Sequence, residues 1–161
     1  MFGLYFDGKS NDMIFANKEE ANKNFYDTGK NESDIKAVTE YLDTGKKFVD
    51  MHAVSEKGSV SVMIKKEENI KDTDTYADRA VVGIKQGMER MGMEVETQKG
   101  SGEFIGETMP YVTVRATDNG NTAYQKIVFL KVGNYVAEIT SYADSEEGAS
   151  KYIDMFTKLE K

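Results

Sequence analysis

The feature that most limits the possible folds is a series of apolar runs joined by tight-turn residues near the C-terminus. Strands are expected over Tyr111–Thr117, about Thr122–Val132 and Tyr135–Tyr142, with the turn pairs Asn119-Gly120 and Gly133-Asn134 between them. Consecutive strands joined by such short turns must run antiparallel. A parallel sheet is therefore excluded for this part of the chain.

The middle strand of this series has apolar side chains in succession over Ile127–Leu130. Since neighbouring side chains of a strand point to opposite faces, both faces of this strand should be covered. The strand is expected in the interior of the sheet.

A capped amphipathic helix leading into a strand is predicted over Asp72–Lys99. Its apolar side chains recur at spacings of three and four: Tyr76, Ala77, Ala80, Val81, Ile84, Met88 and Met91. Side-chain oxygens from Asp72 to Thr75 can cap the first turn, and Gly92 can end the helix in the left-handed conformation. Gly83 and Gly87 disfavour a helix, so we expect them to allow close approach of its backbone to a sheet.

The remaining segments predict further strands and helices around this centre. Glycines and polar residues divide them. They are a first pair of strands at Phe2–Phe6 and Asp12–Phe15, a short helix over Asn17–Phe25, a helix from Ser33 or Asp34 to near Gly45, a hairpin of Lys47–Val54 with Ser59–Lys65, a glycine-containing connection over Lys99–Phe104, and a last helix from Asp144 or Ser145 that aligns Ala149, Tyr152, Ile153, Phe156 and Leu159.

These elements predict an α+β fold in a single domain over residues 1–161. The length of 161 residues is within the range of one domain and allows a sizeable core. We expect a mostly antiparallel sheet of about seven strands with helices packed on its faces, an α/β/α sandwich.

The composition excludes several classes of protein. A formal net charge of −7 argues against a nucleic-acid partner, because binding to phosphates draws on an excess of lysine and arginine. The absence of cysteine removes disulfides, thiolate metal sites and cysteine nucleophiles. No apolar run approaches the roughly 18 residues that a membrane span needs, so direct membrane insertion is not expected.

His52 is the only histidine, and any histidine-based acid–base chemistry must use it. Asp50 lies two positions away, on the same face of a regular strand, so a pair is possible, but an ordinary strand histidine is favoured. Ser55, Ser59 and Ser61 belong to the hairpin and do not form a nucleophile motif. No catalytic residue is assigned, and the chain is not expected to be an enzyme.

The carboxylates are better explained as helix caps than as metal ligands. Asp72, Asp74 and Asp78 begin like a calcium-binding loop, but the glycine and glutamate that such a loop needs are missing. Asp144, Glu146 and Glu147 favour the dipole of the last helix. The glycines after Lys99 lack the ending of a phosphate-binding loop. No metal ligand, cofactor-binding residue or cofactor is assigned.

Two sets of side chains leave alternatives open. Core packing is favoured over an adaptable apolar groove for the methionines Met88, Met91 and Met93. Buried or half-buried strand positions are favoured over an exposed aromatic strip for the tyrosines Tyr111, Tyr124, Tyr135 and Tyr142.

The order of elements and several strings of residues resemble the PsbP-like fold superfamily. The strings are FGLYF with ANKEEA, MHAVSEKGSVSVMI, TYADRAVVGIKQGMERMGMEVE and NGNTAYQKIVFLKVGNYVAEITSYADSEEGASKYIDMF. The superfamily includes the extrinsic subunit of the oxygen-evolving complex, a small Ran-binding import factor and many bacterial lipoproteins. The resemblance implies an architecture and no activity, since none of these strings is a catalytic signature.

The expected function is that of a non-catalytic binding or assembly module that docks an unknown protein or cell-envelope component. The resemblance implies the exported domain of a bacterial lipoprotein, outside the cytoplasm and tethered to the envelope; if Met1 is the natural start, a cytoplasmic location is expected instead. The alternatives are a carrier of a small apolar ligand between the sheet and the methionine-bearing helix, or an enzyme of unrecognised type.

Overall fold

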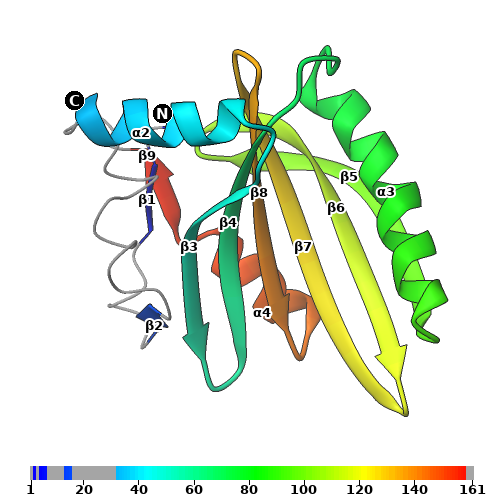
Figure 1. Cartoon of the computed structure of the whole chain (residues 1–161). Helices are drawn as coiled ribbons and strands as arrows, with labels where there is room; N and C mark the ends of the chain where they lie inside the picture. The colour runs from blue at the N-terminus through cyan, green and yellow to red at the C-terminus, as the bar shows by residue number, and fades with distance from the viewer. Residues whose placement is uncertain (1, 3, 7–12, 16–31, 159–161) are drawn as a thin grey trace.

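A computed structural model describes residues 2, 4–6, 13–15 and 32–158. The described elements form a seven-stranded sheet, a separate two-stranded pair and three helices (Figure 1). In chain order they are β1 (Leu4–Phe6), β2 (Ile14–Phe15), α2 (Glu32–Asp43), β3 (Phe48–Ser55), β4 (Gly58–Lys66), α3 (Thr73–Arg90), β5 (Glu94–Phe104), β6 (Glu107–Asp118), β7 (Asn121–Val132), β8 (Tyr135–Ala143), α4 (Glu146–Ile153) and β9 (Phe156–Lys158).

The strand order of the sheet is β2-β3-β4-β8-β7-β6-β5, and every neighbouring pair is antiparallel. Strands β5 to β8 follow one another across the sheet because short turns join them. Asn119 and Gly120 both have positive φ, 50° and 81°, as a two-residue hairpin turn of the predicted kind requires. The predicted α+β class with a mostly antiparallel sheet is confirmed.

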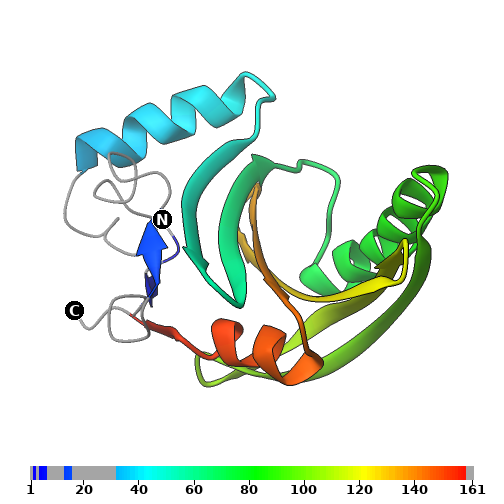
Figure 2. The same ribbon diagram turned by 90° about the horizontal axis from the view of Figure 1, so that it is seen from below.

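Strand β7 separates two hydrophobic cores, as its apolar run predicts. Ile127 and Phe129 pack in the core beneath α3, whereas Val128 and Leu130 pack in the core on the opposite face with α4. Helices α3 and α4 accordingly lie against opposite faces of the sheet (Figure 2). The predicted interior position of β7 is confirmed.

Helix α3 has the predicted start and end. The carboxylate of Asp72 accepts a hydrogen bond from the Thr75 N–H at 2.8 Å, and Gly92 follows the helix with φ of 85°. The prediction that Met91 belongs to the apolar stripe of the helix is wrong. It is the C-cap residue and is 66% exposed, because the helix ends before its side chain reaches the sheet.

The expectation that Gly83 and Gly87 bring α3 close to the sheet is also wrong. Both are exposed, and a Cβ added at either position would have no atom within 4 Å. A close approach between two strands is found at Gly100 of β5, where an added Cβ would overlap the ring of Tyr111 on β6. Glycine is required there so that the tyrosine ring can cover the neighbouring strand.

The segment Lys99–Phe104 is part of a strand and not a connection. Strand β5 continues through it and pairs with β6 from Glu94 to Phe104, and the chain turns only at Ile105 and Gly106, both with positive φ. The glycines in this segment suggested a loop, but the pairing with β6 stabilises an extended conformation there.

The two ends of the described chain pair with each other. Strand β1 pairs with β9, and β2 pairs with the edge of β3, so the predicted pairing of the first two strands is wrong. The last helix begins after its N-cap Ser145 and ends at Ile153, so Phe156 lies in a strand and not on the helix. Leu159 and the predicted helix over Asn17–Phe25 lie outside the described residues.

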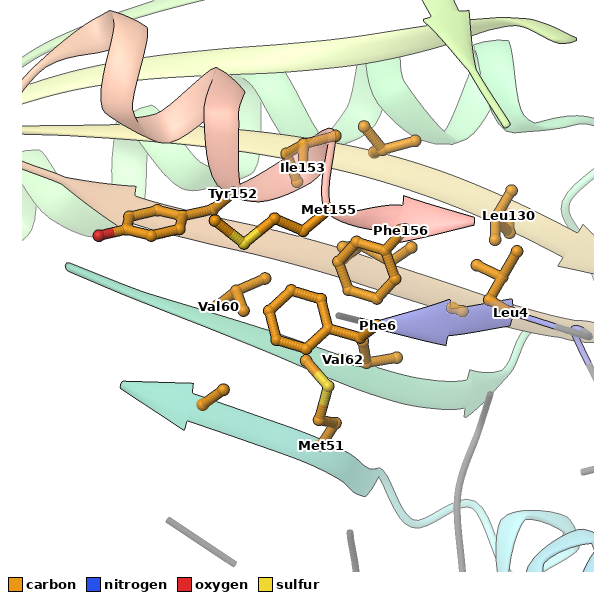
Figure 3. Close-up of a cluster of buried hydrophobic side chains, with 14 of the residues drawn as sticks. Leu4, Phe6, Met51, Val60, Val62, Leu130, Tyr152, Ile153, Met155 and Phe156 are labelled. Carbon is orange, nitrogen blue, oxygen red and sulfur yellow. The ribbon is translucent and has the colours of Figure 1, made fainter. Parts of the chain in front are cut away.

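The core on the α4 face joins this terminal pair to the sheet. The rings of Phe6 and Phe156 have centroids 4.8 Å apart, and both pack with Met51, Val60 and other side chains of β3, β4 and α4 (Figure 3). Helix α2 contributes the fully buried Leu42 to the same core. It begins at Glu32, before the predicted caps Ser33 and Asp34, and it ends at Asp43, near the predicted Gly45, which has φ of 80°.

Candidate functional site

Asp50 and His52 were predicted as a possible pair on one strand face, but the strand is irregular there. The register of β3 against β4 shifts between Val49 and Met51, so Asp50 occupies a β-bulge and the simple alternation fails. Asp50 is buried and His52 is half-buried opposite Ser61. The alternation of faces from which the pair was predicted therefore does not hold between Asp50 and His52.

The serines of the hairpin are divided between its two faces. The Ser55 Oγ lies 2.7 Å from the hydroxyl of Tyr152 on α4, whereas Ser59 and Ser61 lie on the opposite face of β4 from the buried Val60. The Ser55 contact links the β3–β4 turn to α4.

The acidic residues at the helix starts have structural roles. Asp74 and Asp78 both bind the amino group of Lys99, at 2.7 and 2.8 Å, and this joins the first turns of α3 to β5. Glu146 and Glu147 lie in the first turn of α4, where a negative charge favours the helix dipole. Among the described residues, no group of three or more histidines or carboxylates is arranged to hold a metal ion.

The methionines and tyrosines do not form one surface. Met88 and Met93 pack against the core under α3. The side chains of Tyr111, Tyr124 and Tyr135 are partly buried on the α4 face, and Tyr142 points to the other face. The prediction of half-buried strand tyrosines is correct for Tyr111, Tyr124 and Tyr135, whereas Tyr142 is exposed.

A groove lies between α3 and the sheet, with a volume of about 460 Å³. We call it the α3 groove. It is within the range of roughly 300–1,000 Å³ that is usual for ligand sites. Its described lining combines an apolar floor with charged side chains and consists of Lys47, Lys65, Glu67, Ile70, Tyr76, Arg79, Ala80, Gly83, Ile84, Ile127, Phe129 and Glu138.

A hydrogen-bonded network fixes the charged groups inside the α3 groove. The Tyr76 hydroxyl donates to Glu138 Oε1 at 2.6 Å, and Lys65 Nζ lies 3.1 Å from the same oxygen and 4.8 Å from the centre of the Tyr76 ring. Burial and the hydrogen bond to the Glu138 carboxylate raise the pKa of Tyr76 well above its ordinary value. Tyr76 is therefore a neutral hydrogen-bond donor throughout the physiological pH range.

Two further cations line the α3 groove. Lys47, just before β3, and Arg79 on α3 are exposed, and neither side chain forms an ion pair or hydrogen bond with any other residue that the structure describes. The sequence analysis left open a ligand site between the sheet and the methionine-bearing helix, but it did not identify the charged residues of this groove. The available signal was Glu138, a carboxylate inside a strand between the apolar residues Ala137 and Ile139.

Beside the α3 groove, part of the same sheet face has no described helix over it. Helix α3 covers β5, β6 and β7, which leaves the side chains of β3, β4 and β8 on that face. We call this surface the open face. It is formed by Val49, His52, Val54, Ser59, Ser61, Met63, Thr140 and Tyr142. Val49 and Tyr142 are each 46% exposed.

A larger hollow of about 960 Å³ lies on the other face, between α4 and the β3–β4 turn. Its described walls carry exposed charges of both signs, including Glu56, Lys57 and Lys151. The half-buried Ser55 and the buried Tyr152 bind each other. The charged side chains of its described walls are exposed, and no hydrogen-bonded network like that of Tyr76, Glu138 and Lys65 fixes them, so the α3 groove and the open face are the better candidates.

No known protein-family model matches this chain, and no curated protein matches it. Of the described helices, none is both long enough and apolar enough to span a membrane. The function must therefore be argued from the two surfaces described above.

Proposed function

We propose that this protein is a non-catalytic binding module that docks a protein or cell-envelope partner through the open face. The observation that carries the proposal is a half-exposed surface over β3, β4 and β8, on the α3 side of the sheet, that no described helix covers. The resemblance of the sequence to the PsbP-like superfamily supports the same function and a PsbP-like sandwich.

The side chains of the open face are suited to a protein partner. Its central row is His52, Ser61 and Thr140, which lie side by side on three strands. Its members include no aspartate, glutamate, lysine or arginine, although 30 percent of the whole chain is charged. The centres of protein interfaces are depleted in charge and enriched in tyrosine and methionine, here represented by Tyr142 and Met63.

The proposed location is outside the cytoplasm, in the exported part of a lipoprotein. Only the sequence resemblance supports it. Fractionation of the native cells tests this directly: the protein is expected with the envelope, and recovery in the cytosol would contradict it.

The docking proposal is tested by one charge placed at the centre of the open face. Affinity capture from the native envelope should recover the same partner with the wild-type protein and with Ser101→Arg, an exposed position on the edge strand β5. Ser61→Arg should lose that partner, because an arginine would have to be buried in the interface. Equal recovery by both variants would exclude the open face.

A second function, carriage of a small apolar ligand, is favoured by the α3 groove. The groove lies where that function requires it, between the sheet and the methionine-bearing helix. Native mass spectrometry of protein purified from its own organism should then show a retained small molecule. A Gly83→Leu variant, which places a side chain in the groove lining, should be purified without this small molecule.

A further inference from the structure

We propose that the α3 groove binds an amphiphile with one anionic head group, such as a medium-chain carboxylate. Its chain lies on the apolar floor, and its head group lies between Lys47 and Arg79. This inference rests on the second candidate function, ligand carriage, and is independent of docking through the open face.

The floor of the groove accounts for the apolar part of the ligand. Ile127 and Phe129 project from β7 beneath α3, and Ile70 lies beside them at the start of the groove. These side chains belong to a packed core, so their positions are fixed before a ligand arrives. The half-exposed Ala80 and Ile84 of α3 also line the groove, and an alkyl chain packed against these two side chains is removed from water.

The charges inside the groove account for the sign of the head group. Lys65 is 3.1 Å from Glu138 and 3.6 Å from Glu67, and its side chain is only 18% exposed. Both carboxylates therefore have a cationic partner, and Glu138 also accepts the Tyr76 hydrogen bond. The cations without a partner among the described residues are Lys47 and Arg79.

The net charge of the groove lining has the opposite sign to the net charge of the whole chain. The described lining of the groove has three cations and two carboxylates, whereas the formal net charge of the protein is −7. A carboxylate at Lys47 and Arg79 gains ion pairs and leaves the internal network intact. A cationic amphiphile would meet like charges at the same position.

Gly83 leaves room for the ligand. It lines the groove, and a Cβ at this position would have no atom within 4 Å. A glycine inside a helix is less favourable than an alanine, and no packing contact at Gly83 offsets that difference. A larger side chain there should fold well and occupy space that the alkyl chain needs.

The test compares three probes of equal chain length with the full-length protein: dodecanoate and dodecyltrimethylammonium below their micelle concentrations, and dodecanol below its solubility limit. Isothermal titration calorimetry should give the tightest binding for dodecanoate and the weakest for the cationic probe. The double variant Lys47→Gln, Arg79→Gln should weaken dodecanoate about tenfold or more and leave dodecanol nearly unchanged. Arg90→Gln, which removes an exposed cation of α3 outside the groove lining, is the matched control.

Two further variants locate the site and separate the proposals. Gly83→Leu should abolish binding of all three probes with an unchanged circular dichroism spectrum, whereas Ser61→Arg should not affect them. Equal binding of the three probes, or equal weakening by Arg90→Gln, would overturn the anionic head group and leave ligand carriage standing. If none of the probes binds, this inference is wrong. The docking proposal is unaffected by that result, because the affinity capture with Ser61→Arg and Ser101→Arg tests it separately.

Discussion

The hydroxyl of Tyr76 on α3 donates a hydrogen bond to Glu138 Oε1 on β8, 2.6 Å away and 62 residues later in the chain. This bond connects the central helix to the sheet strand next to β7. It also closes one end of the open face, because Glu138 lies on β8 beside Met63 of β4.

Replacement of Tyr76 by phenylalanine is expected to lower the free energy of unfolding by roughly 1.5–3 kcal/mol, because the bond has a charged acceptor. Urea unfolding at neutral pH measures this loss. Tyr142→Phe is the control, since the Tyr142 side chain is 46% exposed, and it should change stability by less than about 0.5 kcal/mol. Equal losses in the two variants would mean that the Tyr76 bond contributes nothing.

Stability is expected to fall at alkaline pH, in part through Tyr76. Burial and the Glu138 carboxylate raise the pKa of Tyr76 in the folded protein above its unfolded value of about 10. The contribution of Tyr76 to the free energy of unfolding is therefore fully present below about pH 10. It is lost as the pH rises further, because the folded protein holds the Tyr76 proton more tightly than the unfolded protein does. Urea midpoints measured from about pH 8 to about pH 11 should fall less steeply for Tyr76→Phe than for the wild type. Tyr135, whose pKa the Asp43 carboxylate also raises, remains in both proteins.

Two glycines near the end of α3 should respond to alanine in opposite directions. Gly87→Ala should stabilise the protein by roughly 0.5–1 kcal/mol, because the position is helical, exposed and free of nearby atoms. Gly92→Ala should destabilise it by about 1 kcal/mol, because φ there is 85°. The change in the melting temperature of each variant tests these two expectations. Stabilisation by Gly92→Ala would show that residue 92 does not have a left-handed conformation.

The terminal strand pair should contribute strongly to stability through Phe156. Its ring lies 4.8 Å from that of Phe6 and 6.1 Å from that of Phe104, and it is 4% exposed. Phe156→Ala should cost about 3–5 kcal/mol in urea unfolding, since it leaves a cavity in the core. The neighbouring variant Thr157→Ala, at an exposed position, should cost less than about 0.5 kcal/mol. A small loss for Phe156→Ala would show that the pair is not packed as described.

The parts of the fold that could be predicted are those set by local sequence. The Asn119-Gly120 turn, the caps of α3 and the two-sided apolar run of β7 each depend on a few adjacent residues. Their physical causes act within one turn or one strand, so the sequence alone was sufficient for the antiparallel sheet and the central helix.

The parts that could not be predicted depend on distant contacts. Gly100 suggested a loop, and only the Tyr111 ring on the next strand explains it as a strand residue. The β-bulge at Asp50 breaks an alternation that looks regular in the sequence. The α3 groove combines residues from 47 to 138, and the pairing of Glu138 with Lys65 becomes visible only when β4 and β8 lie side by side.

The β1–β9 pair has a mechanical consequence. Leu4 lies opposite Lys158 and Phe6 lies opposite Phe156, so the outer residues of both strands are at the same end of the pair. A force that separates Leu4 from Lys158 would load the interstrand hydrogen bonds one at a time, as in a zipper, and not all together in shear. The two strands would peel apart before the seven-stranded sheet carried the load. Leu4 would be the first core side chain drawn into water, followed by Phe6 and Phe156.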